Sequence, residues 1–177
     1  MTDRLRWHAK ARLFDSAGTE VLRRSGVGAV LPDSPLGLAA AIGLAAFRIG
    51  APDQPPPEPH TEPILETLTS GSTGEPRRIR RTQKSWIASF AVNATFGIGP
   101  DARLAVPGRL IHSLSLYGAV EGLHLGAEVH LLADLRPDRQ RAALKDRRIT
   151  HLYATPAQLR LLDGSGTLPD LRLILVG

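Results

Sequence analysis

Residues 69–77 read Thr69-Ser70-Gly71-Ser72-Thr73-Gly74-Glu75-Pro76-Arg77, and the rest of the sequence is interpreted from this stretch. Hydroxyl side chains alternate with glycines, whose backbones reach conformations closed to other residues and approach a ligand closely. Successive backbone N–H groups and hydroxyls in such a turn form a concave anion site. Basic side chains follow directly, at Arg77, Arg78, Arg80, Arg81 and Lys84. The stretch therefore predicts a loop that cradles phosphate.

Two better-known loops do not fit. A P-loop has four residues between its glycines, followed by Lys and Ser or Thr, whereas two residues separate Gly71 from Gly74. A nucleophile elbow requires Gly-x-Ser-x-Gly between a strand and a helix, and residues 69–77 do not contain this pattern. The remaining structural alternative is a surface turn rich in serine and glycine.

The stretch resembles, residue for residue, the signature Thr-Ser-Gly-Ser/Thr-Thr-Gly-x-Pro-Lys of AMP-forming adenylating enzymes, which include acyl-CoA synthetases, luciferases and peptide-synthetase adenylation domains. Arg77 replaces the usual lysine, which keeps the charge but not the compact ammonium group. Leu68 stands where an aromatic residue is usual. The resemblance implies that this loop holds the β and γ phosphates of ATP, with Mg²⁺ as a further cofactor. The residues it implies are Thr69, Ser70, Gly71, Ser72, Thr73 and Gly74.

Arg77 would add a catalytic positive charge, since charge develops on the pyrophosphate that leaves as the acyl-adenylate forms. The alternative for Arg77 is a solvated surface arginine. The resemblance also implies that His112 lines the pocket for the substrate carboxylate. Tyr117 and Gly118 would then lie where the acyl pocket passes the following helix. A histidine that caps a helix and a core aromatic are the alternatives for His112 and Tyr117.

The composition is that of a soluble globular protein, with 42% hydrophobic and 22% charged residues in a chain of 177. There are no cysteines, so disulfides and thiolate metal sites are excluded. His124 and His130 could pair on a metal, but no third ligand has a fitting spacing, and no metal site is predicted. The first residues lack the apolar core of a signal peptide. The longest apolar run, residues 36–47, is shorter than the roughly 20 residues of a membrane span. We therefore expect a cytoplasmic protein.

The net charge of +5 is of the kind found in nucleic-acid-binding proteins. Only 5% of the residues are aromatic, and no run interleaves them with basic residues as a stacking platform would. A genomic bias toward arginine explains the charge equally well. Nucleic-acid binding is therefore placed behind nucleotide binding.

Local signals outline the fold. Residues 27–31 are typical of a strand, Ser34 and Pro35 of a helix start, and residues 36–49 of a buried helix that ends at Gly50. Residues 52–63 hold six prolines and predict an extended, solvated linker. Further strands are expected at residues 64–69, 103–107, 128–132, 149–154 and 171–176. Helices are expected from Thr82 onward and at residues 113–125, 138–147 and 155–162.

Strands that alternate with helices at this spacing imply right-handed βαβ units. The predicted fold class is α/β, with a mainly parallel sheet and flanking helices. The predicted division is a small N-terminal α/β lobe at 1–51, the linker at 52–63 and a phosphate-loop subdomain at 64–177. The subdomain's sheet should begin with the strand at residues 64–69.

The resemblance covers residues 27–52 loosely and 64–177 well, which amounts to the N-terminal part of such an enzyme. It implies activation of a carboxylic acid as its adenylate and transfer to CoA or a carrier thiol. The family's remaining groups follow the matched region, so the chain alone should bind nucleotide weakly without adenylating. The last strand should pair with a second copy or with a separate C-terminal half. The alternative is a non-catalytic nucleotide-binding, phosphate-binding or interaction module.

Overall fold

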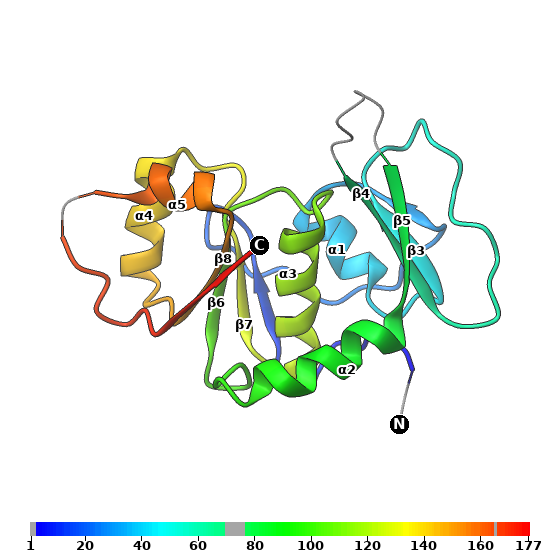
Figure 1. Ribbon diagram of the computed structural model, residues 1–177, viewed down its shortest axis with the longest axis horizontal. Coiled ribbons are helices and arrows are strands. Elements are labelled where there is room, and N and C mark those ends of the chain that lie inside the picture. Colours follow the sequence, from blue (N-terminus) through cyan, green and yellow to red (C-terminus); the bar gives the residue numbers. More distant parts are fainter. Residues whose placement is uncertain (1–2, 70–76, 165) are drawn as a thin grey trace.

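The computed structural model describes residues 3–69, 77–164 and 166–177, which form two β-sheets with helices between and outside them (Figure 1). The first sheet is parallel throughout and has the strand order β1-β7-β6-β8-β9. Its strands are β1 (Arg12–Phe14), β7 (Glu128–Leu131), β6 (Arg103–Val106), β8 (His151–Ala154) and β9 (Leu173–Val176). The second sheet has the order β2-β3-β4-β5. Its strands are β2 (Val30–Leu31), β3 (Ala46–Ile49), β4 (Ile64–Thr69) and β5 (Arg77–Thr82).

The helices arrange these sheets in layers. Helices α1 (Pro35–Ala41) and α3 (Ser113–Leu125) lie between the two sheets, and α4 (Pro137–Asp146) and α5 (Pro156–Leu162) lie on the outer side of the first sheet (Figure 1). Helix α2 (Gln83–Ala94) runs below α3 in the same view. The predicted α/β class with mainly parallel strands is confirmed. No helix in the described part of the chain is long and apolar enough to cross a membrane.

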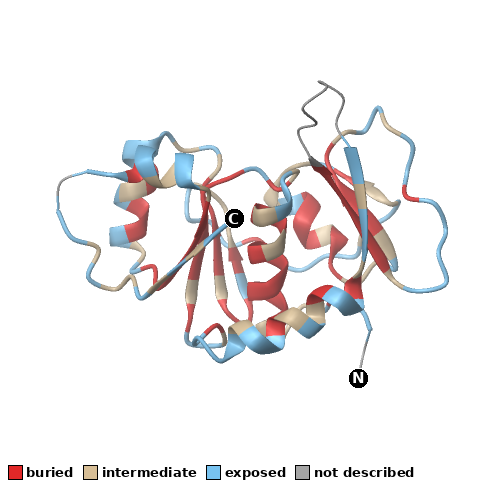
Figure 2. Ribbon diagram, in the orientation of Figure 1, coloured by how far each residue is buried: buried red, intermediate tan, exposed pale blue. Residues whose placement is uncertain are grey.

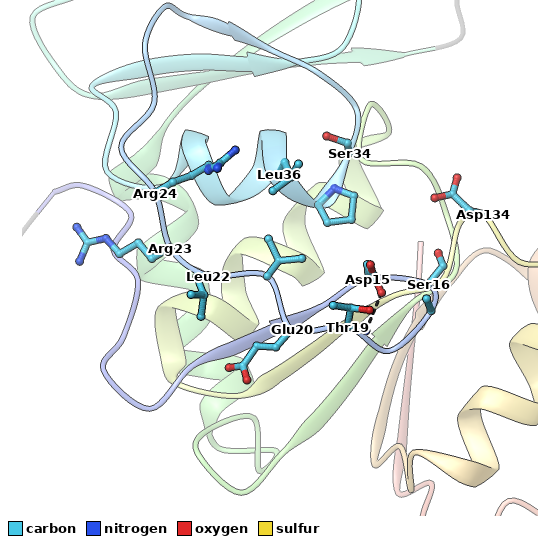
Figure 3. A pocket seen from close by; sticks show the side chains of 13 residues that line it. Asp15, Ser16, Thr19, Glu20, Leu22, Arg23, Arg24, Ser34, Leu36 and Asp134 are labelled. Carbon is cyan, nitrogen blue, oxygen red and sulfur yellow. Dashed lines mark hydrogen bonds between the residues drawn. The ribbon is translucent and has the colours of Figure 1, made fainter.

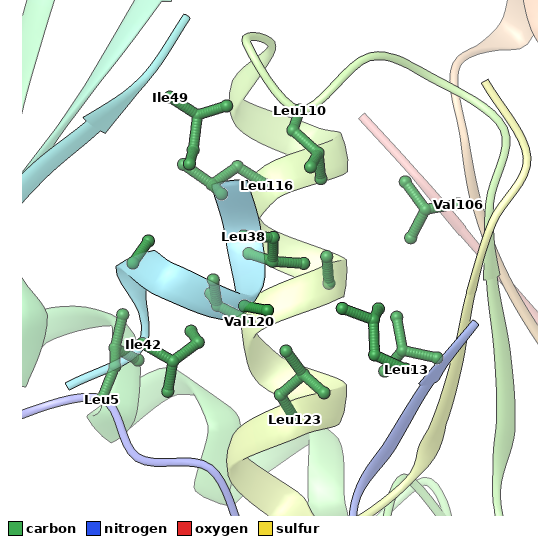
Figure 4. Close-up of a cluster of buried hydrophobic side chains, with 14 of the residues drawn as sticks. Leu5, Leu13, Leu38, Ile42, Ile49, Val106, Leu110, Leu116, Val120 and Leu123 are labelled. Atoms are coloured by element: carbon green, nitrogen blue, oxygen red, sulfur yellow. The ribbon is translucent and has the colours of Figure 1, made fainter. Parts of the chain in front are cut away.

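The main core fills the space between the sheets. Burial is concentrated on α1, α3 and the strand faces turned toward them (Figure 2). Helix α3 is buried on almost every side, as expected for a helix enclosed between two layers. Figure 4 shows the side chains that meet there, which include Leu13, Leu38, Ile42, Ile49, Val106, Leu116, Val120 and Leu123.

Several helix ends lie where the sequence signals place them. The Thr82 hydroxyl accepts a hydrogen bond from the Ser85 amide at the start of α2. Helix α3 ends at Gly126, which has a φ of 98°. Thr155 and Gln158 form a reciprocal capping box at the start of α5. These helix starts and ends are confirmed. They could be predicted because each capping residue acts on groups within one turn of the helix end.

The predicted helix at residues 36–49 is wrong in its second half. Helix α1 ends at Ala41, Gly43 has a φ of 101°, and the chain re-enters as strand β3. Gly50, expected to end a helix, follows this strand instead. An apolar run buried on all sides has the same composition in either conformation, so its periodicity did not separate the two.

Strand β4 does not open the first sheet. It pairs in parallel with β3 and antiparallel with β5, so Leu68 and Ile174 lie in different sheets, with βαβ units between them. The reason is that residues 77–82 return as a hairpin strand instead of crossing over. Strand β1 joins the first sheet beside β7. Each sheet therefore contains strands from both of the predicted units, 1–51 and 64–177. The division of the chain into domains stays a prediction.

The proline-rich segment is not a solvated connector along its whole length. Carbonyl oxygens of Ala51, Gln54 and Pro55 accept hydrogen bonds from the Arg48 guanidinium at 2.9–3.2 Å. Proline lacks an N–H group but keeps its carbonyl acceptor, so such a segment can surround a cation. We call residues 51–58 the strap, because they lie against the second sheet through these bonds.

Candidate functional site

The hairpin of β4 and β5 carries the predicted phosphate loop. Thr69 and Arg77 are opposite each other in the antiparallel register and form the last described pair of the hairpin. Arg77 is exposed. Ser70, Gly71, Ser72, Thr73 and Gly74 lie outside the described residues, as does the side chain of Thr69. Phosphate binding by these residues stays a prediction, and the structure supplies the stem that presents them.

His112 lies beside this stem. Its backbone forms an isolated parallel bridge with Leu68, one residue before Thr69. His112 is exposed and occupies the N-cap position of α3, but its side chain makes no capping hydrogen bond. The structure thus brings His112 next to the β4–β5 stem, at the N-cap position that the capping alternative gives it but without a side-chain capping bond, and its role toward the substrate stays a prediction.

The segment before His112 is held by contacts that the sequence did not reveal. The Leu110 amide donates to the Asp33 carboxylate at 2.9 Å. Ile111 packs on Gly50, where an added Cβ would lie 3.2 Å from the Ile111 side chain. These contacts join the end of β6 to the ends of β2 and β3, at the end of the molecule where β4 also ends (Figure 1). Ligands of open α/β sheets bind at the carboxyl ends of the strands.

Tyr117 and Gly118 face away from the hairpin in their described contacts. The Tyr117 ring packs edge-on against Trp86 and Phe90, with centroids 5.1 and 5.2 Å away. Its hydroxyl lies 2.7 Å from the Ser89 hydroxyl of α2. Gly118 lies against the Tyr153 ring, which would be 2.6 Å from an added Cβ. These residues pack α3 on α2 and β8, and their contact with an acyl group stays a prediction.

A buried carboxyl group lies within this packing. Glu121 is fully buried and accepts hydrogen bonds from the Tyr153 hydroxyl and from Asn93. Burial raises the pKa of Glu121 to about 7, against the opposing effect of those two hydrogen bonds. Burial and the neighbouring Glu121 raise the pKa of Tyr153. This group titrates near neutral pH within the α2–α3 interface, away from the hairpin.

His124 and His130 have separate surroundings. His124 accepts a hydrogen bond from the Arg6 amide at 3.3 Å, and His130 stacks on Phe14 at 4.7 Å. Burial, followed by nearby cationic groups, lowers the pKa of each histidine to about 4. Within residues 3–69, 77–164 and 166–177, no group of three His, Cys, Asp or Glu could hold a metal ion.

A cavity of about 660 Å³ lies elsewhere on the molecule (Figure 3). It is formed by residues 15–24, by the start of α1 and by Asp134. The Asp15 carboxylate turns inward to accept a hydrogen bond from the Thr19 amide at 2.8 Å. None of the predicted site residues lines this cavity, so its size alone does not connect it with the hairpin.

With this geometry in place, comparison with known proteins decides the family. The model of the AMP-binding enzyme family matches residues 6–177. The chain belongs to this family. An uncharacterized acyl-CoA ligase of Bacillus subtilis, YhfT, is 36% identical over 128 residues, which are 72% of this chain and 27% of YhfT. A putative long chain fatty acid-CoA ligase of Staphylococcus haemolyticus, VraA, is 45% identical over 59 residues, 33% of this chain and 13% of VraA.

Solved structures show the same fold. The Bacillus subtilis o-succinylbenzoate CoA synthetase MenE in complex with AMP superimposes with a TM-score of 0.61 and 16% identity, over 88% of this chain and 56% of that chain. MenE in complex with ATP and magnesium gives a TM-score of 0.56 and 22% identity, over 63% of this chain and 24% of that one. The chain thus spans about a quarter of the length of YhfT and about an eighth of the length of VraA.

Proposed function

We propose that this chain is the phosphate-binding part of an AMP-forming acid:thiol ligase. The observation that carries the proposal is the β4–β5 stem, which sets Thr69 opposite Arg77 and lies beside His112. The family match and the acyl-CoA ligase names of YhfT and VraA support it. In the proposed reaction a carboxylate oxygen attacks the α-phosphorus of ATP, and the bond to the bridging oxygen breaks. Pyrophosphate leaves with the bonding electrons.

The proposed roles follow the position of each group. Residues 69–74 bind the β and γ phosphates, and Arg77 stabilises the charge that develops on pyrophosphate. His112 faces the acid, with Tyr117 and Gly118 behind it in α3. The acceptor is proposed to be a thiol, with CoA favoured over a carrier protein by the printed names of the relatives.

ATP fits the charge of the hairpin, while Mg²⁺ has no protein cage among the described residues. Magnesium usually keeps several waters and binds through substrate phosphates with one or two carboxylates. We therefore propose that Mg²⁺ arrives with ATP, and the structure of MenE in complex with ATP and a magnesium ion supports this pairing of cofactors. When bound, it would neutralise phosphate charge. A cytoplasmic location stays a prediction from the sequence.

The second candidate is a non-catalytic module that binds nucleotide or phosphate. The observation in favour of a non-catalytic module is that the chain spans only 27% of the length of YhfT. Positioning of two reactants can be worth about 7–11 kcal/mol of barrier, and we propose that most of the residues which position the acid in such a ligase lie outside the part of YhfT that this chain covers. We propose that the 177-residue chain binds ATP weakly and does not adenylate by itself.

Two measurements on the same preparation test this. ATP binding is measured by calorimetry, and acid-dependent ATP–pyrophosphate exchange is measured with a panel of carboxylic acids. We expect weak binding that Ser72→Ala with Arg77→Ala removes, and no exchange. Exchange that depends on an acid and is lost in the double variant would show a working enzyme in this chain. If the double variant binds ATP as well as the wild type does, the loop is not the ATP-binding site.

A further inference from the structure

We propose that Glu66 is a positioning residue, which holds the strap and two arginines of β5 in place so that Thr69 and Arg77, the last described pair of the hairpin, are positioned for phosphate binding. This inference rests on the proposed function, because it assigns a role toward the phosphate that residues 69–77 are proposed to bind. It centres on Glu66 and Arg48, neither of which the sequence alone indicated as important.

Glu66 lies at the centre of a row across three strands. The register pairs Arg48 of β3 with Glu66 of β4, and Glu66 with Arg80 of β5. Side chains directly opposite in neighbouring strands share one face of the sheet. The Glu66 carboxylate accepts from Arg48 at 3.1 Å and from Arg80 at 3.3 Å. The side chains of Arg48 and Glu66 are 0% and 3% exposed, so this ion pair is inside the protein.

Arg78, which pairs with Leu68 two register positions further along the hairpin, joins the same carboxylate. Its guanidinium donates to Glu66 at 2.7 Å and to the strap carbonyl of Pro55 at 3.0 Å. Arg48 donates to the same Pro55 carbonyl at 2.9 Å. One carboxylate and one strap carbonyl are therefore shared between β3 and β5, and they fix both strands relative to β4.

Alternation along β5 divides the basic run between two faces. Successive side chains of a strand point to opposite sides, so Arg78 and Arg80 share the Glu66 face while Arg77 lies on the other. The sequence suggested that all of these arginines supply charge to the phosphate loop. The structure instead ties Arg78 and Arg80 to Glu66 and the strap, and leaves Arg77 as the pair of Thr69 at the tip.

Glu66 is charged in this setting. Burial alone would raise its pKa, but hydrogen bonds from Arg78, Arg80 and Arg48 outweigh burial and hold the pKa below its ordinary value. Without the carboxylate, three guanidinium groups would repel one another and Arg48 would be a buried cation without a counter-ion. The strands could then keep their fold only by moving apart, which would shift Thr69 relative to Arg77.

The sign of a charge change separates positioning from simple electrostatics. Glu66→Gln removes a negative charge close to the proposed site, so electrostatics alone would strengthen binding of an anion. If Glu66 acts by positioning the hairpin, Glu66→Gln should weaken binding of the anion instead. We expect the dissociation constant for inorganic pyrophosphate, measured by calorimetry on the 177-residue chain, to rise about tenfold. Glu66→Asp keeps the charge but shortens the side chain, and its effect should be intermediate.

Glu62→Gln is the matched control, since Glu62 is exposed, lies four positions before Glu66 and makes the same charge change. It should leave pyrophosphate affinity unchanged or slightly improved. Hydrogen exchange adds a second readout, and the Arg78 and Arg80 amides should exchange faster in Glu66→Gln but not in Glu62→Gln. Should Glu66→Gln fail to fold, the Glu66→Asp comparison decides.

Folded Glu66 variants that bind pyrophosphate as tightly as the wild type overturn this inference and leave the proposed function standing. A wild-type chain that does not bind pyrophosphate overturns the proposed function, and this inference with it. Weaker binding in both Glu66 variants, with Glu62→Gln unchanged, supports the positioning role.

Discussion

Gln83 is a single side chain on which three segments depend. It is fully buried at the start of α2, and its carbonyl oxygen accepts from the Leu5 amide at 2.8 Å. Its amide nitrogen donates to the backbone oxygens of Leu44 and Ile64 at 2.9 and 3.1 Å. Gln83→Leu would remove the acceptor of the buried Leu5 amide and one donor from each of the two carbonyl groups. We expect a loss of about 2–4 kcal/mol in unfolding free energy, measured by urea denaturation.

The neighbouring Lys84 provides the control for Gln83, because it is exposed on the same turn of α2. Lys84→Leu should change the unfolding free energy by less than about 0.5 kcal/mol. A Gln83→Leu protein as stable as this control would mean that the N-terminal segment does not rely on Gln83.

Glu121 gives the protein a pH dependence of predictable sign. Its folded pKa of about 7 lies above the ordinary value of 4.5. The folded state therefore binds the proton more tightly, and stability is lost as pH rises from about 4.5 through 7. Glu121→Gln resembles the neutral form. Between pH 4.5 and 8 we expect the unfolding free energy of the variant to gain roughly 3 kcal/mol relative to that of the wild type, measured by denaturation at each pH.

His124 and His130 act in the opposite sense, since their lowered pKa values reduce stability as pH falls below 6.5. They titrate in both proteins, so the difference between wild type and Glu121→Gln cancels them. A difference that stays constant over this pH range would show that Glu121 is ionised throughout.

At the scale of elements, α3 and β8 approach each other through Gly118. An added Cβ would lie 2.6 Å from the Tyr153 ring, closer than real contacts allow. Gly118→Ala should gain helix propensity but force the ring or the helix to move, with a net loss of about 1–3 kcal/mol. Gly99→Ala is the control, because an added Cβ there has no neighbour within 4 Å. Equal melting temperatures for the two variants would contradict the close packing.

The elements that could be predicted from sequence are those whose ends are encoded locally. Thr82, Gly126 and Thr155 mark ends of α2, α3 and α5 through hydrogen bonds or a positive φ within one turn. The strand at 46–49 and the return of β5 were missed, because strand pairing depends on residues distant in sequence. A buried apolar run is compatible with a helix or a strand until its neighbours are known.

At the scale of the whole molecule, the same distinction applies to the candidate site. The loop is recognisable because its residues are consecutive. The Arg48–Glu66 pair joins residues 18 apart on different strands, so only the register reveals it. A glutamate within an otherwise uncharged strand, followed by an arginine-rich strand, was the available signal. It indicates a buried ion pair, though not which arginines take part.

The last prediction concerns β9, an edge strand of the first sheet. Ile174 and Val176 are 42% and 55% exposed there, and an unpaired edge with apolar side chains is a template for another strand. We expect the 177-residue chain to self-associate with rising concentration, measured by sedimentation velocity. Ile174→Lys with Val176→Lys should keep the fold and abolish the association. Val92→Lys, on the exposed side of α2 at 59% exposure, should not. A wild-type chain that stays monomeric at all concentrations would show that the β9 edge does not pair by itself.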